Sequence, residues 1–164
     1  MLILEDSANM RRILTPLLRS FGFEAFHYAT NSQMALGLLR KGGIDLSIVD
    51  WPMKAQGGID FARMVRAEKT SPDPYLPIIL LSGFTDPERM RIARNMGVNE
   101  ILAKPFSPEA LYGRLTSIVR QPRPFFETGS YFEPDRRTGT AGVAVPYRRR
   151  RDKRWLSARK SHIA

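Results

Sequence analysis

Short apolar runs alternate with amphipathic stretches along the first 120 residues, and this alternation constrains the fold more than any other feature of the chain. Runs that are apolar throughout, without polar residues at every second position, are typical of parallel strands buried on both faces. The expected strands are Leu2–Leu4, Phe23–Tyr28, Leu46–Val49, Ile78–Leu81 and Glu100–Ala103.

The stretches between these runs carry apolar residues at helical spacing. A first helix is expected from the N-cap Ser7 to Phe21, although Pro16 in its interior favours a kink. The other expected helices are Ser32–Arg40, Ile59–Glu68, one that begins near Thr85 and one that begins near Ser107. Five strand–helix pairs predict an α/β domain in which a doubly wound, five-stranded parallel sheet is flanked by five helices.

Charged and hydroxyl side chains follow four of the five runs. Glu5 and Asp6 come after the first run, Asp50 after the third, Ser82 at the end of the fourth and Lys104 after the fifth. Because the loops after the carboxyl ends of parallel strands converge on one crevice, we expect these groups to meet at one rim of the sheet.

This set of side chains has the chemistry of a magnesium and phosphoryl site. Carboxylates without sulfur or imidazole suit Mg²⁺, which keeps several waters and leaves positions for phosphate oxygens. Asp50 is the best candidate nucleophile, since it ends a central-looking strand. Lys104 would offset phosphoryl charge, and Ser82 would donate a hydrogen bond.

Residues 2–119 resemble the receiver domain of bacterial two-component response regulators. The resemblance rests on four motifs in order: Leu4-Glu5-Asp6, Val49-Asp50-Trp51-Pro52-Met53 with Gly58 eight residues after the aspartate, Leu81-Ser82-Gly83, and Leu102-Ala103-Lys104-Pro105-Phe106. It implies a flavodoxin-like fold with strand order 2-1-3-4-5. It also implies that the chain catalyses only its own aspartyl phosphorylation and dephosphorylation.

By the same resemblance, Asp50 accepts a phosphoryl group from a histidine kinase or phosphotransfer protein. Glu5 and Asp6 hold Mg²⁺, and the backbone carbonyl of Pro52 is a further ligand. Ser82 and Lys104 contact the phosphoryl group, and the Lys104–Pro105 peptide bond is cis. Phosphorylation then controls binding of an unknown downstream protein, through the fourth helix, the fifth strand and the fifth helix.

Two departures from the family pattern keep a rival hypothesis open. Lys54 stands where family members usually have proline, and Ile101 stands where many have an aromatic switch residue. The rival is a receiver that no longer accepts phosphate and acts as an interaction module. An aspartate-dependent phosphatase is disfavoured, because the general acid it would need two residues after Asp50 is replaced by Pro52.

Composition excludes several other classes of site. The chain has no cysteine, so disulfides and thiolate sites are excluded, and its two histidines, His27 and His162, lie far apart in sequence. No apolar run approaches the ~20 residues that span a bilayer, and no basic leader precedes the first strand. We therefore expect a cytoplasmic protein.

The periodic pattern stops after Arg120, so we expect a receiver domain over residues 1–120 and a tail over residues 121–164. The tail has eleven basic and four acidic residues, within a chain of net charge +10. Its composition predicts that it is mostly disordered. The segment Arg148–Arg154, six of whose seven residues are basic, predicts a solvated extension, binding to nucleic acid, or docking on an acidic protein or membrane surface.

Overall fold

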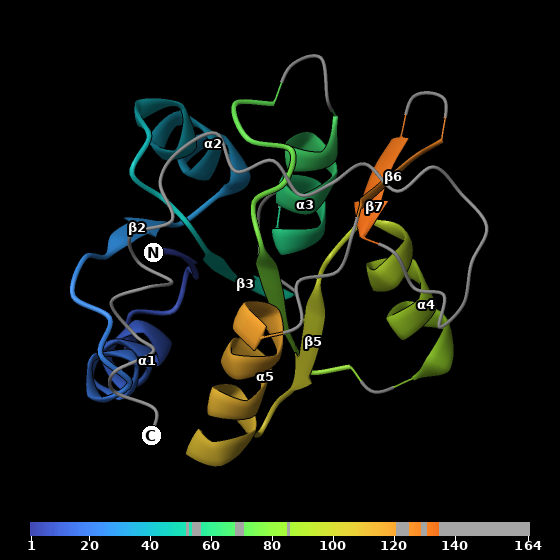
Figure 1. Ribbon diagram of the computed structural model, residues 1–164. Helices are drawn as coiled ribbons and strands as arrows, with labels where there is room; N and C mark the ends of the chain where they lie inside the picture. The colour runs from blue at the N-terminus through green and yellow to red at the C-terminus, as the bar shows by residue number, and fades with distance from the viewer. Residues whose placement is uncertain are drawn as a thin grey trace.

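A computed structural model describes residues 1–51, 53, 57–67, 71–84, 86–120, 125–128 and 131–134. Strands and helices alternate in the order β1 (Leu2–Leu4), α1 (Ala8–Ser20), β2 (His27–Ala29), α2 (Ser32–Lys41), β3 (Ser47–Trp51), α3 (Gly58–Arg66), β4 (Ile78–Ser82), α4 (Pro87–Asn95), β5 (Glu100–Ala103) and α5 (Pro108–Arg120). Two further strands, β6 (Phe125–Thr128) and β7 (Tyr131–Pro134), follow (Figure 1).

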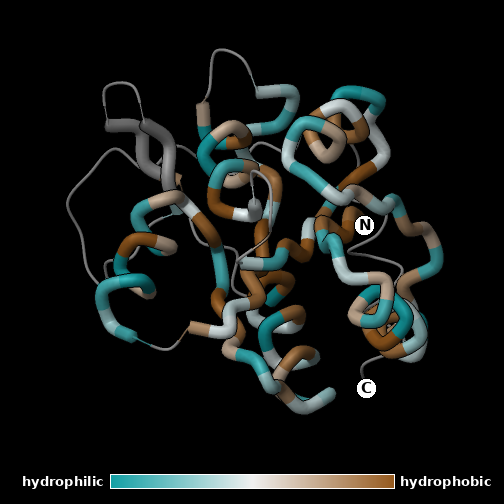
Figure 2. The backbone as a smooth tube through the Cα atoms, turned by 180° about the vertical axis from the view of Figure 1, so that it is seen from behind, coloured by the Kyte–Doolittle hydropathy of each residue, from teal (hydrophilic) through white to brown (hydrophobic). Residues whose placement is uncertain are grey.

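The first five strands form one parallel sheet in the order β2-β1-β3-β4-β5. The predicted doubly wound fold and strand order are therefore confirmed. Successive strand residues point to opposite faces, so each face has its own apolar core. One core joins Leu4 and Val49 to α2, α3 and α4, and the other joins Ile3 and Ile48 to α1 and α5. Figure 2 shows the hydrophobic strands at the centre of the domain.

The expected first helix is confirmed, and one strand boundary in the first third of the chain needs correction. Helix α1 continues through Pro16 to Ser20, and Pro16 lies on its exposed side. Strand β2 begins at His27, four residues later than expected. The reason is that Gly22 has a φ of 84° and the N–H of Phe23 donates to the carbonyl of Leu18, so this segment closes the helix.

Part of the segment expected to be disordered is folded. Strands β6 and β7 pair antiparallel, with Phe125 opposite Pro134, and both of these residues are buried. The Phe125 ring lies against Tyr75 and over the guanidinium of Arg66. The expectation is therefore wrong for these eight residues, because an apolar anchor docks on the domain. The basic segment Arg148–Arg154 lies outside the described residues, and its binding partners stay a prediction.

Candidate functional site

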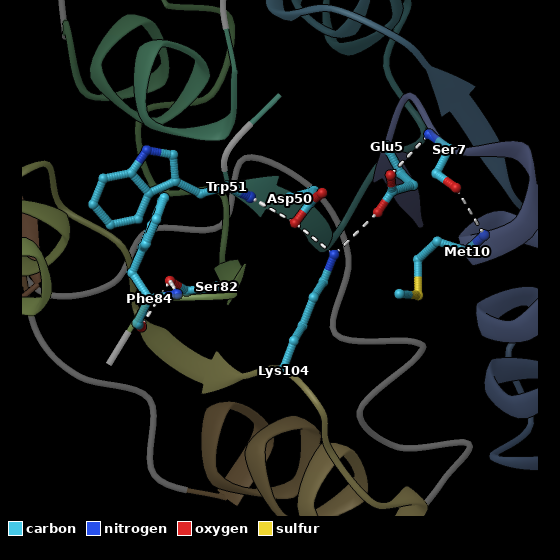
Figure 3. Close-up of polar contacts among 8 residues, drawn as sticks. All are labelled: Glu5, Ser7, Met10, Asp50, Trp51, Ser82, Phe84 and Lys104. Carbon is cyan, nitrogen blue, oxygen red and sulfur yellow. Dashed lines mark hydrogen bonds and ion pairs between the residues drawn. The ribbon is translucent and has the colours of Figure 1, made fainter. Parts of the chain in front are cut away.

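The register of the parallel sheet brings the predicted site residues to one rim. Leu4 is aligned with Val49, so Glu5, the residue after β1, lies level with Asp50 near the end of β3. Ser82 is aligned with Ala103, so Lys104 follows at the next position. Figure 3 shows the side chains of Glu5, Asp50 and Lys104 directed toward one another, as expected from the convergence of strand carboxyl ends.

Three carboxylates form the acidic part of the site. Glu5, Asp6 and Asp50 each offer an oxygen, and these oxygens lie within 4.8 Å of one another. Glu5 is 1% exposed and Asp50 is 7% exposed, whereas Asp6 is exposed to solvent. Clustered negative charge of this kind is stabilised by a cation, and oxygen ligands suit a hard divalent cation such as Mg²⁺. The donor set therefore fits the metal predicted from the sequence.

Lys104 supplies a cation between two carboxylates of the cluster, those of Asp50 and Glu5 (Figure 3). Its Nζ atom lies 2.7 Å from Oδ1 of Asp50 and 3.5 Å from Oε2 of Glu5. The backbone N–H of Lys104 donates to the carbonyl of Ser82, which fixes the start of the loop after β5. The Lys104–Pro105 bond is cis, as the resemblance implied. Lys104 thus bridges two of the three carboxylates.

The backbone around Asp50 is held closely. The N–H of Trp51 donates to Oδ1 of Asp50 at 2.7 Å, the same oxygen that contacts Lys104. Gly58, at the start of α3, packs so tightly on β3 that a Cβ atom there would lie 2.5 Å from the carbonyl oxygen of Asp50. Only glycine allows α3 to begin so close to the strand that carries Asp50.

Ser82 lies at the end of β4, but its hydrogen bonds are made within its own loop. Its hydroxyl donates to the carbonyl of Phe84 and accepts from the N–H of Phe84, both at 3.0 Å. The structure therefore places Ser82 beside the acidic cluster with its proton directed elsewhere (Figure 3). Pro52, the expected source of a carbonyl ligand, and Lys54 lie outside the described residues. Ile101 packs against the core formed with α2, α3 and α4.

Three residues that the sequence analysis did not single out also contact this rim. Arg11 donates from its guanidinium to the backbone carbonyl of Glu5 at 2.6 Å. The Phe84 ring lies between Trp51 and Arg89. Arg11 lies on a helix whose pattern carries no signal for this contact. Phe84 lies two residues after Ser82, a spacing that allows its contact with the hydroxyl but does not predict it, because a strand-end hydroxyl can equally bond a ligand.

Burial is the main reason that the pKa of Glu5 is raised above its usual value of 4.5. The negative charge of Asp50 raises it further, whereas the N–H of Ser7 and the ammonium of Lys104 act in the opposite direction. Folded Glu5 therefore retains a proton at pH values where the unfolded chain has lost it.

The raised pKa of Glu5 predicts a pH-dependent loss of stability. Without divalent cations, the free energy of unfolding should fall as the pH rises from 4.5 through the higher pKa of folded Glu5, because the folded state binds more protons there. The free energy of unfolding, measured with urea at several pH values in this range, should depend less steeply on pH in Glu5→Gln than in the wild type. The matched control is Glu24→Gln, which changes an exposed loop carboxylate. If Glu5→Gln keeps the pH dependence of the wild type, Glu5 is not the group that causes it.

Among the described residues, no helix combines the length and the hydrophobicity that crossing a membrane requires.

Comparison with known proteins identifies the family. A family model described as the response regulator receiver domain matches residues 1–116. Chemotaxis protein CheY-3 of Vibrio cholerae is 34% identical over 120 residues, which cover 73% of this chain and 91% of the relative. The solved structure of a putative response regulator from Chloroflexus aurantiacus has a TM-score of 0.66 at 28% identity, and covers 73% of this chain and 96% of that one. Chemotaxis response regulator CheY4 of Vibrio cholerae has a TM-score of 0.64 at 29% identity, and covers 71% of this chain and 95% of that one. The chain therefore belongs to the family of response regulator receiver domains, the phosphorylation-dependent signalling domains of two-component systems.

Proposed function

We propose that Asp50 is the phosphoryl acceptor of this response regulator and that Glu5, Asp6 and Asp50 hold the Mg²⁺ ion on which the transfer depends. The observation that carries the proposal is the contact of Lys104 with Asp50 beside two further carboxylates. The expected donor is the phosphohistidine of a histidine kinase or phosphotransfer protein. Small acyl phosphates also carry a phosphoryl group on a good leaving group, so they can replace the phosphohistidine donor.

In the proposed reaction, a carboxylate oxygen of Asp50 attacks the phosphorus atom of the donor. The bond from phosphorus to the donor nitrogen breaks, and the departing imidazole takes up a proton, so an acyl phosphate forms without any oxidation or reduction. When bound, Mg²⁺ supplies charge stabilisation to the phosphoryl oxygens and orients them. The ammonium of Lys104 adds a positive charge at the same group. The Trp51 N–H holds Asp50 in place.

Pro52 stands where an aspartate-dependent phosphatase would need its general acid, so we propose a protein that catalyses only its own phosphorylation and dephosphorylation. Its output would be phosphorylation-dependent binding to a downstream protein. The rival, a receiver that acts without phosphate, predicts no labelling and a partner that binds the unmodified chain equally well.

The test is labelling with acetyl phosphate in the presence of Mg²⁺. Intact mass should show one phosphoryl group, which hydroxylamine should remove because an acyl phosphate is a mixed anhydride with an activated acyl carbon. Borohydride reduction followed by peptide mapping should place the modification on Asp50. Labelling that persists in excess chelator, or that maps to a serine or histidine, would contradict the proposal.

Replacing Lys104 by alanine should separate metal binding from phosphoryl transfer. Lys104 contacts both Asp50 and Glu5, so its ammonium would compete with a bound cation for the same oxygens. We expect Lys104→Ala to retain or tighten Mg²⁺ binding, measured by the fluorescence of Trp51. We expect the same variant to slow labelling by roughly 10–100-fold, because the charge stabilisation from the ammonium is lost. Lys41→Ala, on the exposed end of α2, is the control. Labelling at the wild-type rate would remove Lys104 from the reaction.

A further inference from the structure

The three carboxylates of the site are held in place by different parts of the fold. Asp50 belongs to β3, and the N–H of Glu5 donates to the carbonyl of Ala29 at 3.0 Å, which continues the pairing of β1 with β2. Asp6 comes next and is exposed to solvent, in the turn that connects β1 with α1. The position of its carboxylate therefore depends on the hydrogen bonds of this acidic turn, residues 5–7.

Arg11, in the first turn of α1, holds both ends of the acidic turn. Its guanidinium donates to the carbonyl of Glu5 at 2.6 Å, and its backbone N–H donates to the carbonyl of Ser7 at 3.1 Å. The bond from the guanidinium is charge-assisted, and such bonds are stronger than those between neutral groups. Because a peptide unit is planar, this bond fixes the whole unit between Glu5 and Asp6.

The peptide unit on the other side of Asp6 is fixed by Glu5. The N–H of Ser7 donates to Oε1 of Glu5 at 2.9 Å (Figure 3). The peptide units before and after Asp6 thus each carry a hydrogen bond, and together these bonds set the direction in which the Asp6 side chain leaves the backbone. The bond from Arg11 can be removed without changing any proposed metal ligand.

The charge of Arg11 and its contact with Glu5 have opposite effects on a bound cation. A guanidinium near metal-binding carboxylates repels Mg²⁺, so loss of the charge alone would tighten Mg²⁺ binding. Loss of a contact that orients Asp6 would weaken it. Residues that orient metal ligands typically contribute a factor of about 10–100 to affinity, whereas charges near solvent are screened. We therefore expect the orienting effect to be the larger.

We propose that Arg11 is a positioning residue of the metal site: its bond to the Glu5 carbonyl orients the Asp6 carboxylate toward the oxygens of Glu5 and Asp50. The inference rests on the proposed function, in which these three carboxylates hold Mg²⁺. Arg11 acts through the backbone of the acidic turn. Its loss should therefore change the affinity for Mg²⁺ rather than the transfer step that follows.

The test measures Mg²⁺ binding by calorimetry and labelling by acetyl phosphate over a range of Mg²⁺ concentrations. Arg11→Met removes the donor and should weaken Mg²⁺ binding about tenfold. The Mg²⁺ concentration for half-maximal labelling should rise by the same factor, while the rate at saturating Mg²⁺ stays within about twofold of the wild type. Arg11→Lys keeps the charge and one donor, so its affinity should lie between the two.

Arg12→Met is the matched control, because Arg12 is the next residue of α1, carries the same charge and is exposed. It should bind Mg²⁺ at least as tightly as the wild type. Urea unfolding establishes that each variant is folded. Should Arg11→Met fail to fold, the comparison passes to Arg11→Lys, in which wild-type affinity would contradict the positioning role.

Two outcomes separate this inference from the proposed function. If Arg11→Met binds Mg²⁺ as tightly as Arg12→Met, the positioning role of Arg11 is wrong, while labelling of Asp50 in the wild type still supports the proposed function. If the wild type neither binds Mg²⁺ nor takes up a phosphoryl group, both are overturned.

Discussion

Asp50→Asn is expected to abolish phosphoryl labelling by acetyl phosphate while leaving a folded domain. The amide keeps the size of the carboxylate and can still accept the hydrogen bond from the Trp51 N–H, but it has no nucleophilic oxygen that could form an acyl phosphate. Removing one of three clustered negative charges should also weaken Mg²⁺ binding. The measurement is intact mass after incubation with acetyl phosphate and Mg²⁺, together with urea unfolding to establish that the variant is folded.

The matched control for Asp50→Asn is Asp60→Asn. Asp60 lies on α3 and makes an exposed ion pair with Arg63, so its removal tests whether any aspartate loss reduces labelling. Wild-type labelling of Asp60→Asn beside unlabelled Asp50→Asn would assign the reaction to Asp50. Full labelling of Asp50→Asn would show that another residue accepts the phosphoryl group and would overturn the assignment to Asp50.

The placement of the acidic cluster was predictable because it follows from the topology of a parallel sheet. Glu5 directly follows one buried apolar run and Asp50 directly follows another. Neighbouring parallel strands end at the same edge of the sheet, so the two carboxylates meet there. Lys104 was predictable for the same reason. Their approach within a few ångströms depends on register, which the apolar patterns determine when both faces of each strand are buried.

The hydrogen bonds of Ser82 could not be predicted in this way. A strand-end hydroxyl can bond to its own loop or to a ligand, and the choice depends on local backbone angles that no pattern reveals. The β6–β7 hairpin was missed because an isolated hairpin of two four-residue strands has little intrinsic stability. Its docking depends on Phe125 and on a buried arginine, Arg66, and arginine is rarely fully buried. Tertiary contacts decided both cases.

That buried arginine should be among the most sensitive positions for stability. Arg66, the last residue of α3, is 0% exposed, and its guanidinium donates to the carbonyls of Gly97, Pro74 and Leu76 at 2.7–2.9 Å. It also donates to the Asn99 side chain at 3.0 Å. These contacts link α3, the loop before β4 and the turn before β5.

The turn before β5 is shaped around this side chain. Gly97 has a φ of 78°, and a Cβ atom there would lie 2.8 Å from Cγ of Arg66. On the other side, the Phe125 ring lies 5.0 Å from the guanidinium carbon. The arginine therefore joins the hairpin to the domain as well as the two loops to each other, so a shorter side chain would leave several groups without partners at once.

Arg66→Met should lower the free energy of unfolding by about 3–5 kcal/mol, because it keeps the apolar stem but leaves buried carbonyls without donors. Arg66→Lys should recover only part of this loss, since an ammonium lacks the planar fork that reaches several acceptors. Arg63→Met, one turn earlier on α3, removes an exposed ion pair and should cost less than about 1 kcal/mol. Urea unfolding measures all three variants, with the wild type as reference. Equal stability of Arg66→Met and Arg63→Met would show that the guanidinium contributes nothing net, because its desolvation would then offset its hydrogen bonds.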